Sequence, residues 1–258
     1  MKHLKLFNDN ASYEAYMEGD GVILPNVSYI KDGEVYYNPE PVISYVAVDL
    51  GLPSGTLWAD RNIGATSPED DGLYFAWGET VGYTAKQVTN GEKTFSSDWS
   101  DYFDTTDGGS TFNKYTPGKL SVLEASDDAA TVNMGSDWRI PTYDEISELM
   151  SEFKNNTTLT FIDLQGNEFS QEEAKNGAIG NVNLKGVRFT GPNGNSIFVP
   201  ASGFYSDGRR GGRLNQYLYM RSQRINGNTT APGMFILNGR KYSSGVNRYL
   251  GIPVRAVK

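Results

Sequence analysis

Short runs of alternating apolar and polar residues, separated by Gly, Pro, Asn and Asp, fill this chain from Tyr45 to its carboxyl end. A period of two is typical of strands with one buried face, and the separating residues are those that turns require. Helix signals are confined to the stretches near 143–154 and 170–176. The pattern predicts an α+β domain of mostly short antiparallel strands with one or two helices.

The clearest helix signal is the T-x-x-E pattern of Thr142 and Glu145 after Pro141. In such a capping box each side chain binds the backbone N–H of the other residue, which fixes the start of a helix. The apolar spacing that follows predicts one buried side, formed by Ile146, Leu149, Met150 and Phe153. Another short helix is expected at the DDAA run, with Ser126 as its cap.

Two hairpins are also expected. Alternating strands flank Asp32-Gly33, a dipeptide that favours a tight turn, and Val187 and Phe189 alternate against Ile197 and Val199 around Pro192-Asn193-Gly194. The segment 83–117 is rich in Thr, Ser, Gly and Asp, which indicates a surface insertion. Its aromatic residues Trp99, Tyr102 and Phe103 suggest that it folds back on the domain.

Residues 1–45 are predicted to form a small amino-terminal arm, with a short helix around 12–18 and the first hairpin; Pro39 and Pro41 mark its end. A segment this short does not hold a core alone, so it should pack on the main domain, 46–258, or on a partner chain. In the second case the arm would be a homo-oligomerisation element.

Composition limits the chemistry. The net charge of −8 argues against a nucleic-acid surface, which needs a basic stripe. Without cysteine there is no thiolate nucleophile or thiolate metal site, and the single histidine, His3, leaves no His-based triad or zinc cluster. The cluster of Arg209, Arg210 and Arg213 is better explained as a solvated loop than as an anion site.

The amino terminus is polar within ten residues and lacks the apolar core of a secretory signal. No later segment approaches the length of a membrane span, so we expect no membrane insertion.

Several motifs together resemble one family: GLPSGTLWADRNIGA at 51–65, YFAWGET at 74–80, WRIPT before the acidic helix, and the closing G-x-x-V-R-x-V. They are similar to the "major paralogous domain" family of Bacteroidetes and Fibrobacter surface proteins. The resemblance implies a C-type-lectin-like fold, which formylglycine-generating enzymes and the variable proteins of diversity-generating retroelements share. The enzymes work through cysteine chemistry, so that activity does not transfer to this chain.

Carboxylates offer the only metal candidates. Asp101, Asp104, Asp107, Asp127 and Asp128 could supply oxygen ligands to calcium, although EF-hand spacing is absent and a solvated acidic loop is favoured. We otherwise expect no cofactor.

Two kinds of residue are expected to be structural. Arg255 alternates with valines on a terminal strand and is better explained by an internal ion pair or carbonyl contacts than by a ligand. Trp58, Trp77 and Trp138 are expected in the core.

The candidate binding face lies near the carboxyl end, where side chains suited to recognition alternate with apolar ones. It comprises Tyr217, Tyr219, Arg221, Gln223, Arg224, Asn226, Asn228, Asn238, Arg240, Tyr242, Asn247, Arg248 and Tyr249. Leu218, Met220, Phe235 and Leu237 between them are expected to be buried. An ordinary polar face is the alternative.

The leading hypothesis is a non-enzymatic binding module that presents this face to a protein or glycan receptor on a cell surface, as a phage or prophage receptor-binding protein or a retroelement-diversified variable protein. A bacterial surface adhesin or glycan-binding protein is the first alternative, and an enzyme of unknown type is the second. We expect the protein outside its cell of origin, as a virion component or a cell-surface protein.

Overall fold

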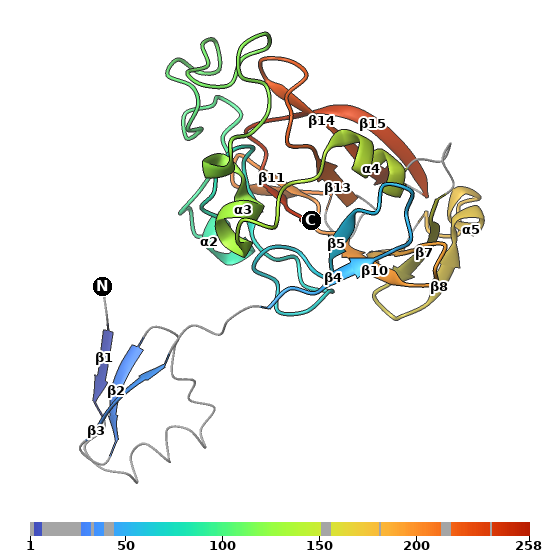
Figure 1. Cartoon of the computed structure of the whole chain (residues 1–258), viewed down its shortest axis with the longest axis horizontal. Coiled ribbons are helices and arrows are strands. Elements are labelled where there is room, and N and C mark those ends of the chain that lie inside the picture. The colour runs from blue at the N-terminus through green and yellow to red at the C-terminus, as the bar shows by residue number, and fades with distance from the viewer. Residues whose placement is uncertain are drawn as a thin grey trace. The chain divides into compact units, whose positions relative to one another are not determined.

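The computed structural model describes residues 3–6, 27–31, 34–38, 44–150, 156–180, 182–212, 218–237 and 239–258; before Ser44 it describes the backbone alone. The chain divides into two compact units, Met1–Ser44 and Tyr45–Lys258 (Figure 1).

The first unit contains a three-stranded sheet in the order β1-β2-β3, formed by His3–Leu6, Val27–Lys31 and Glu34–Asn38. β1 pairs with β2 in parallel. β2 and β3 are antiparallel, and Lys31 pairs with Glu34, so the hairpin predicted around Asp32-Gly33 is confirmed. The helix predicted around 12–18 lies outside the described residues.

The second unit is built from small sheets. β4 (Ala47–Asp49) pairs with β5 (Leu57–Ala59), β6 (Tyr74–Phe75) with β16 (Ile252–Pro253), and β11 (Phe204–Ser206) with β12 (Arg209–Gly211). A four-stranded sheet has the order β10-β9-β7-β8, from Ser196–Pro200, Leu184–Thr190, Thr158–Asp163 and Glu168–Ser170. A three-stranded sheet joins β13 (Leu218–Arg221), β14 (Thr230–Leu237) and β15 (Arg240–Asn247).

The helices are short: α2 (Ala85–Thr89), the 3-10 turn η1 (Ala125–Asp127), α3 (Ala129–Met134), α4 (Tyr143–Met150) and α5 (Gln171–Lys175). Strands make up 33% of the structure and helices 13%, with several small antiparallel sheets, so the α+β prediction is wrong and the chain is mostly β. The physical reason is that α2, α3 and α5 end after one or two turns at Asn90, Gly135 and Asn176, residues typical of turns; Gly135 has φ 101°.

The local predictions around these elements fare better. The capping box of α4 is confirmed, because the backbone N–H of Thr142 donates to Glu145 at 2.7 Å and that of Glu145 donates to the Thr142 hydroxyl at 3.2 Å. The second hairpin is confirmed by the pairing of Phe189 with Ile197 in β9 and β10. The cap of α3 is wrong: Asp128 accepts the N–H groups of Ala130 and Thr131.

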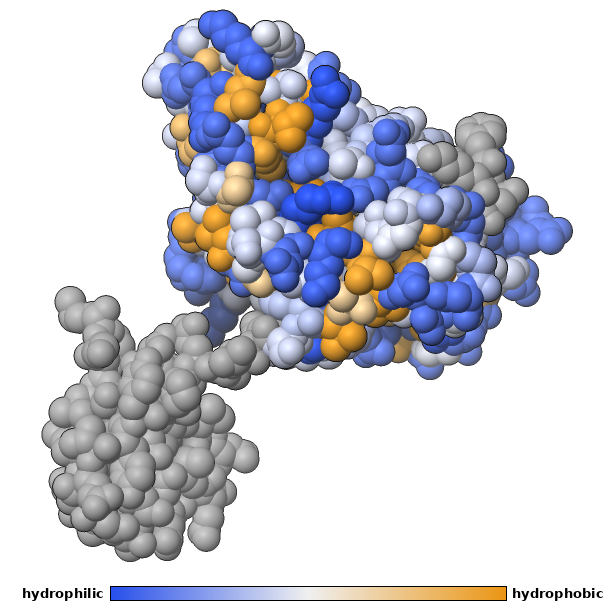
Figure 2. All heavy atoms as spheres, viewed as in Figure 1, coloured by the Kyte–Doolittle hydropathy of each residue, from blue (hydrophilic) through white to orange (hydrophobic). Residues whose placement is uncertain are grey.

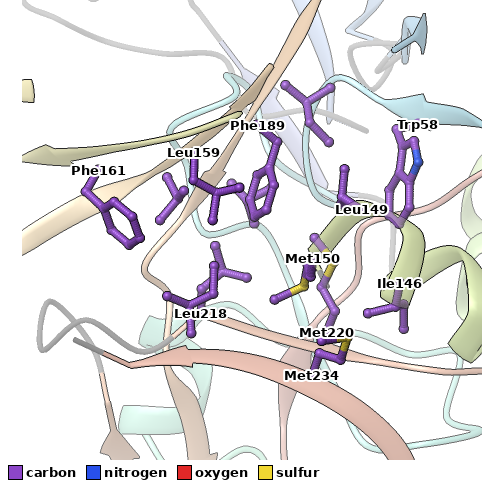
Figure 3. Close-up of a cluster of buried hydrophobic side chains, with 14 of the residues drawn as sticks. Trp58, Ile146, Leu149, Met150, Leu159, Phe161, Phe189, Leu218, Met220 and Met234 are labelled. Carbon is purple, nitrogen blue, oxygen red and sulfur yellow. The ribbon is translucent and has the colours of Figure 1, made fainter. Parts of the chain in front are cut away.

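The main core lies between the four-stranded and three-stranded sheets, with α4 packed against β13 and β14 (Figures 1 and 3). Ile146, Leu149 and Met150 of α4 are fully buried, as predicted, whereas Phe153 lies outside the described residues. Figure 3 shows Met150 beside Met220 and Met234 of the three-stranded sheet. One face of that sheet is therefore buried in the core.

The three tryptophans predicted in the core are there: Trp58, Trp77 and Trp138 have at most 6% of their surface exposed. In the 83–117 segment Trp99 and Tyr102 are buried against the domain, while Phe103 is 42% exposed. None of the helices in the described part of the chain has the length and apolarity needed to span a membrane.

Candidate functional site

Aromatic side chains form a row across the three-stranded sheet, on the face opposite the α4 core. Tyr219 of β13 pairs with Phe235 of β14, which pairs with Tyr242 of β15, so the three rings are in register. Their centroids are 5.4 and 5.1 Å apart, with interplanar angles of 26° and 17°. Phe204 of β11 meets Tyr219 edge-on at 5.4 Å. We call these four residues the aromatic row.

The aromatic row is partly open to solvent. Tyr242 is 39% exposed on the edge strand β15, and the other three side chains are half-buried. The alternate residues Leu218, Met220, Met234 and Ile236 are buried on the opposite face. Those residues fill the core, so the row lies on the other face of the sheet, and the stacking of its rings holds them in place.

Arg221 lies on the same strand face and is half-buried, with its guanidinium bonded within the domain. Its guanidinium donates to the backbone carbonyls of Asn247 at 2.9 Å, Leu250 at 3.2 Å and Phe75 at 3.1 Å. Burial lowers the pKa of Arg221 to about 10. The segments that follow β15 and enclose β6 cover this end of the sheet, so Arg221 joins them together and does not face a receptor.

Arg248 is likewise internal. Its guanidinium binds the Asp104 carboxylate, and both side chains are at most 1% exposed. The cation also lies 4.8 Å from the ring centroid of Trp77 and 4.4 Å from that of Phe112. The placement of Arg248 on a binding face is therefore corrected: it attaches the 83–117 segment to the domain.

The other predicted residues occupy several places. Arg240 is exposed beside the aromatic row, where it pairs with Leu237, and Asn247 is half-buried at the far end of β15. Tyr249 is half-buried and meets Trp99 edge-on at 5.0 Å. Gln223 is half-buried next to the exposed Arg224, Asn226 and Asn228, which lie in the connection from β13 to β14; Tyr217 and Asn238 lie outside the described residues.

The predicted set therefore does not form one continuous face. The aromatic row crosses β14 at Phe235, whereas the 223–229 connection joins β14 at Thr230. Five residues at about 3.4 Å each separate these positions by roughly 17 Å along the strand. Tyr219, Tyr242 and Arg240 are brought together at one end, and Arg224, Asn226 and Asn228 at the other.

Phe204 and Phe235 were not among the predicted site residues. Phe235 was expected in the core, yet it stands between the two tyrosines. The signal for it is the Asn238-Gly239 dipeptide, which favours a two-residue hairpin turn and so pairs Leu237 with Arg240 and Phe235 with Tyr242. Nothing local in the sequence brings Phe204 to Tyr219.

The acidic candidates for calcium bind the protein's own donors. Asp101 accepts backbone N–H groups of Phe95 and Ser96, both at 2.8 Å, and Asp104 accepts those of Lys114 and Tyr115. Asp128 caps α3, Asp127 binds Lys114, and Asp107 accepts the N–H of Thr111. Within the described ranges no three His, Cys, Asp or Glu side chains gather as metal ligands would.

An acidic pair that the sequence did not indicate surrounds Lys93. Its ammonium lies 2.8 Å from Glu79 and 3.7 Å from Asp101. Burial raises the pKa of Glu79, although Lys93 opposes the shift. The three side chains tie the 93–101 loop to the turn after Trp77.

Two further arginines are structural. Arg255, as expected, binds internal acceptors: Asn62 at 2.9 Å and the carbonyl of Phe198 at 2.9 Å, and burial lowers its pKa to about 9. Arg210 binds Asp71 and lies over the ring of Tyr74 at 5.3 Å, so it is not part of a solvated loop. Arg213 lies outside the described residues.

Exposed apolar residues also occur elsewhere. Val46, Val81, Val132 and Leu164 are 47–64% exposed, and Figure 2 shows hydrophobic residues in small groups between hydrophilic ones. What distinguishes the aromatic row is its register across three strands.

The chain matches no protein-family model, no curated protein and no solved structure with which it was compared. The family resemblance therefore stays a prediction, and the function rests on the geometry above.

Proposed function

We propose that the protein is a non-enzymatic binding module that contacts a receptor on a cell surface through the aromatic row. The observation that carries the proposal is the register of Tyr219, Phe235 and Tyr242 on a sheet whose opposite face is packed. Large, rigid rings lose little conformational entropy on binding and are enriched at the energetic centres of interfaces. Arg240 beside them adds forked donors.

A protein receptor is favoured over a glycan at this row. Rings 5.1–5.4 Å apart with nearly parallel planes overlap one another, so they present edges and hydroxyl groups more than open faces. A sugar ring packs best on an open aromatic face, whereas a protein surface can fit a ridge of ring edges. In this proposal the chain acts outside its cell of origin, as a virion component or as a cell-surface protein.

The test is binding of the fluorescently labelled protein to a panel of intact bacterial strains, measured by flow cytometry. We expect labelling of at least one strain, and loss of at least 90% of it in the Tyr219→Ala/Tyr242→Ala variant. Leu164→Ala, at a position 47% exposed and outside the row, is the matched control and should label like the wild type.

Treating the cells separates the receptor classes. Protease digestion of the cell surface should abolish labelling, while periodate oxidation of its glycans should leave it. Labelling that survives protease and is lost to periodate would support the glycan alternative. An equal loss in the control and the double variant, or no labelling of any strain, would count against the aromatic row.

A further inference from the structure

An open depression lies at the other end of the three-stranded sheet. It is lined by Pro117, Gly118, Ser121, Arg224, Ile225, Asn226 and Pro232, has a volume of about 400 Å³ and opens to solvent. This volume falls within the range of about 300–1,000 Å³ that small-ligand sites occupy.

The rim of the depression is fixed by the backbone. The N–H of Ile225 donates to the carbonyl of Ser121 at 2.8 Å, and the N–H of Leu123 donates to Gln223 at 3.0 Å. The N–H of Asn226 donates to Thr230 at 3.1 Å, which closes the loop back onto β14. The 121–123 and 223–226 segments are thus held together before any ligand arrives.

The charge in the depression is positive. Arg224 is exposed, and among the described residues no carboxylate lies within ion-pair distance of its guanidinium. The acids that follow the 117–121 loop, Glu124 and Asp127, both bind Lys114 at 2.6 Å. In a chain with a net charge of −8, an uncompensated arginine in a concave site favours an anionic ligand.

A second polar residue, Asn226, lines the same depression. The Asn226 side-chain oxygen accepts a hydrogen bond from the Thr230 hydroxyl at 2.8 Å, which fixes the amide so that its NH₂ group remains as a donor. The rest of the lining is apolar: Pro117, Ile225 and Pro232. An inorganic anion would satisfy Arg224 but leave this apolar surface in water.

We propose that the depression binds an acidic sugar unit, a pyranose ring that carries a carboxylate. The guanidinium of Arg224 donates hydrogen bonds to the carboxylate, and the amide NH₂ of Asn226 donates to a ring hydroxyl. The apolar face of the sugar ring packs on Pro117 and Pro232. This site is separate from the aromatic row, so it does not depend on the function proposed for that row.

The test titrates the full-length protein with 3′-sialyllactose and with trigalacturonate, using lactose as the neutral counterpart, by calorimetry and by amide NMR shifts. We expect at least one acidic sugar to bind and to shift the amides of Ser121, Ile225 and Asn226, with lactose at least tenfold weaker. Arg224→Gln should weaken binding at least tenfold. Arg209→Gln, at an exposed arginine outside both the depression and the aromatic row, should bind as the wild type does.

Three outcomes would overturn the proposal. The first is that neither acidic sugar binds. The second is that Arg209→Gln loses as much affinity as Arg224→Gln, which indicates general attraction of charge. The third is that inorganic phosphate displaces the sugar at equal concentration, which indicates an anion site without sugar recognition. Unchanged thermal unfolding of both variants establishes that each is folded. Cell labelling through the aromatic row is scored separately with the Tyr219→Ala/Tyr242→Ala variant.

Discussion

Arg248 and Asp104, 144 residues apart in sequence, form an ion pair that solvent does not reach. Asp104 also accepts the N–H groups of Lys114 at 2.6 Å and Tyr115 at 3.0 Å, and Arg248 donates to the carbonyls of Tyr115 and Asn228. The pair therefore links the long insertion, the β13–β14 connection and the end of β15.

Replacing Asp104 by Asn should lower the free energy of unfolding by about 3–5 kcal/mol, because the Arg248 charge would stay buried without its counter-charge. Urea unfolding followed by tryptophan fluorescence measures the change. The exposed Arg240→Met variant is the control and should stay within about 0.5 kcal/mol of the wild type. A loss below 1 kcal/mol for Asp104→Asn would show that the pair is not closed to water.

Glu145 should make stability depend on acid pH. Burial raises its pKa, but hydrogen bonds from Arg139 and Thr142 outweigh burial and lower the pKa from 4.5 to about 2. A depressed pKa stabilises the fold above the unfolded value, and that contribution is lost as pH falls from about 4.5 towards 2.

The Glu145→Gln variant should thus be about 1 kcal/mol less stable than the wild type at pH 6, with the difference shrinking towards zero near pH 2. Denaturant unfolding at a series of pH values gives both curves. Asp144→Asn, an exposed carboxylate in the same helical turn, is the matched control and should change stability by less than about 0.5 kcal/mol. Parallel curves for Glu145→Gln and the wild type would contradict the assignment.

Local signals predicted much of this fold. The capping box at Thr142 and the turn at Pro192-Asn193-Gly194 act over a few residues, so the sequence shows them directly. The bounds of α5 were predicted closely, because the helix expected near 170–176 covers Gln171–Lys175. The α+β class is wrong because helices this short make up only 13% of the structure, against 33% for strands.

The site was harder to predict, because alternation shows which residues share a strand face but not what covers that face. Tyr219 and Arg221 share one face of β13, yet only Arg221 lies under the chain that returns after β15. Arginine is a residue type common at binding surfaces, but Arg248 is buried in an ion pair with Asp104 of the 83–117 insertion. Burial of a strand face by segments distant in the sequence depends on tertiary packing, which local sequence patterns do not show.

Gly191 should not tolerate a side chain. A Cβ at this position would lie 1.9 Å from the carbonyl oxygen of Leu50, a backbone atom that does not move without displacing the loop before β5. Gly191→Ala should therefore cost about 1–3 kcal/mol or more of unfolding free energy. Gly227→Ala, whose nearest neighbour would be a threonine hydroxyl at 3.3 Å, is the control and should change stability little. Equal melting temperatures for both variants would argue against this packing.

Alanine substitutions in the aromatic row and in the core should differ in their effects on stability and on cell labelling. Trp138 is 6% exposed, meets Tyr45 edge-on at 6.4 Å and lies under the Lys258 ammonium at 4.9 Å. Trp138→Ala should cost about 3–5 kcal/mol of unfolding free energy. Tyr242→Ala, at the exposed end of the row, should cost at most about 1 kcal/mol while reducing cell labelling.

Tyr249 is not a suitable second position for this comparison, because its ring packs on Trp99 and its loss would disturb the insertion. Thermal unfolding and flow cytometry on the same protein preparations give both quantities. If Tyr242→Ala proved as destabilising as Trp138→Ala, the row would be part of the core, because exposed side chains that contact a partner contribute little to the free energy of unfolding.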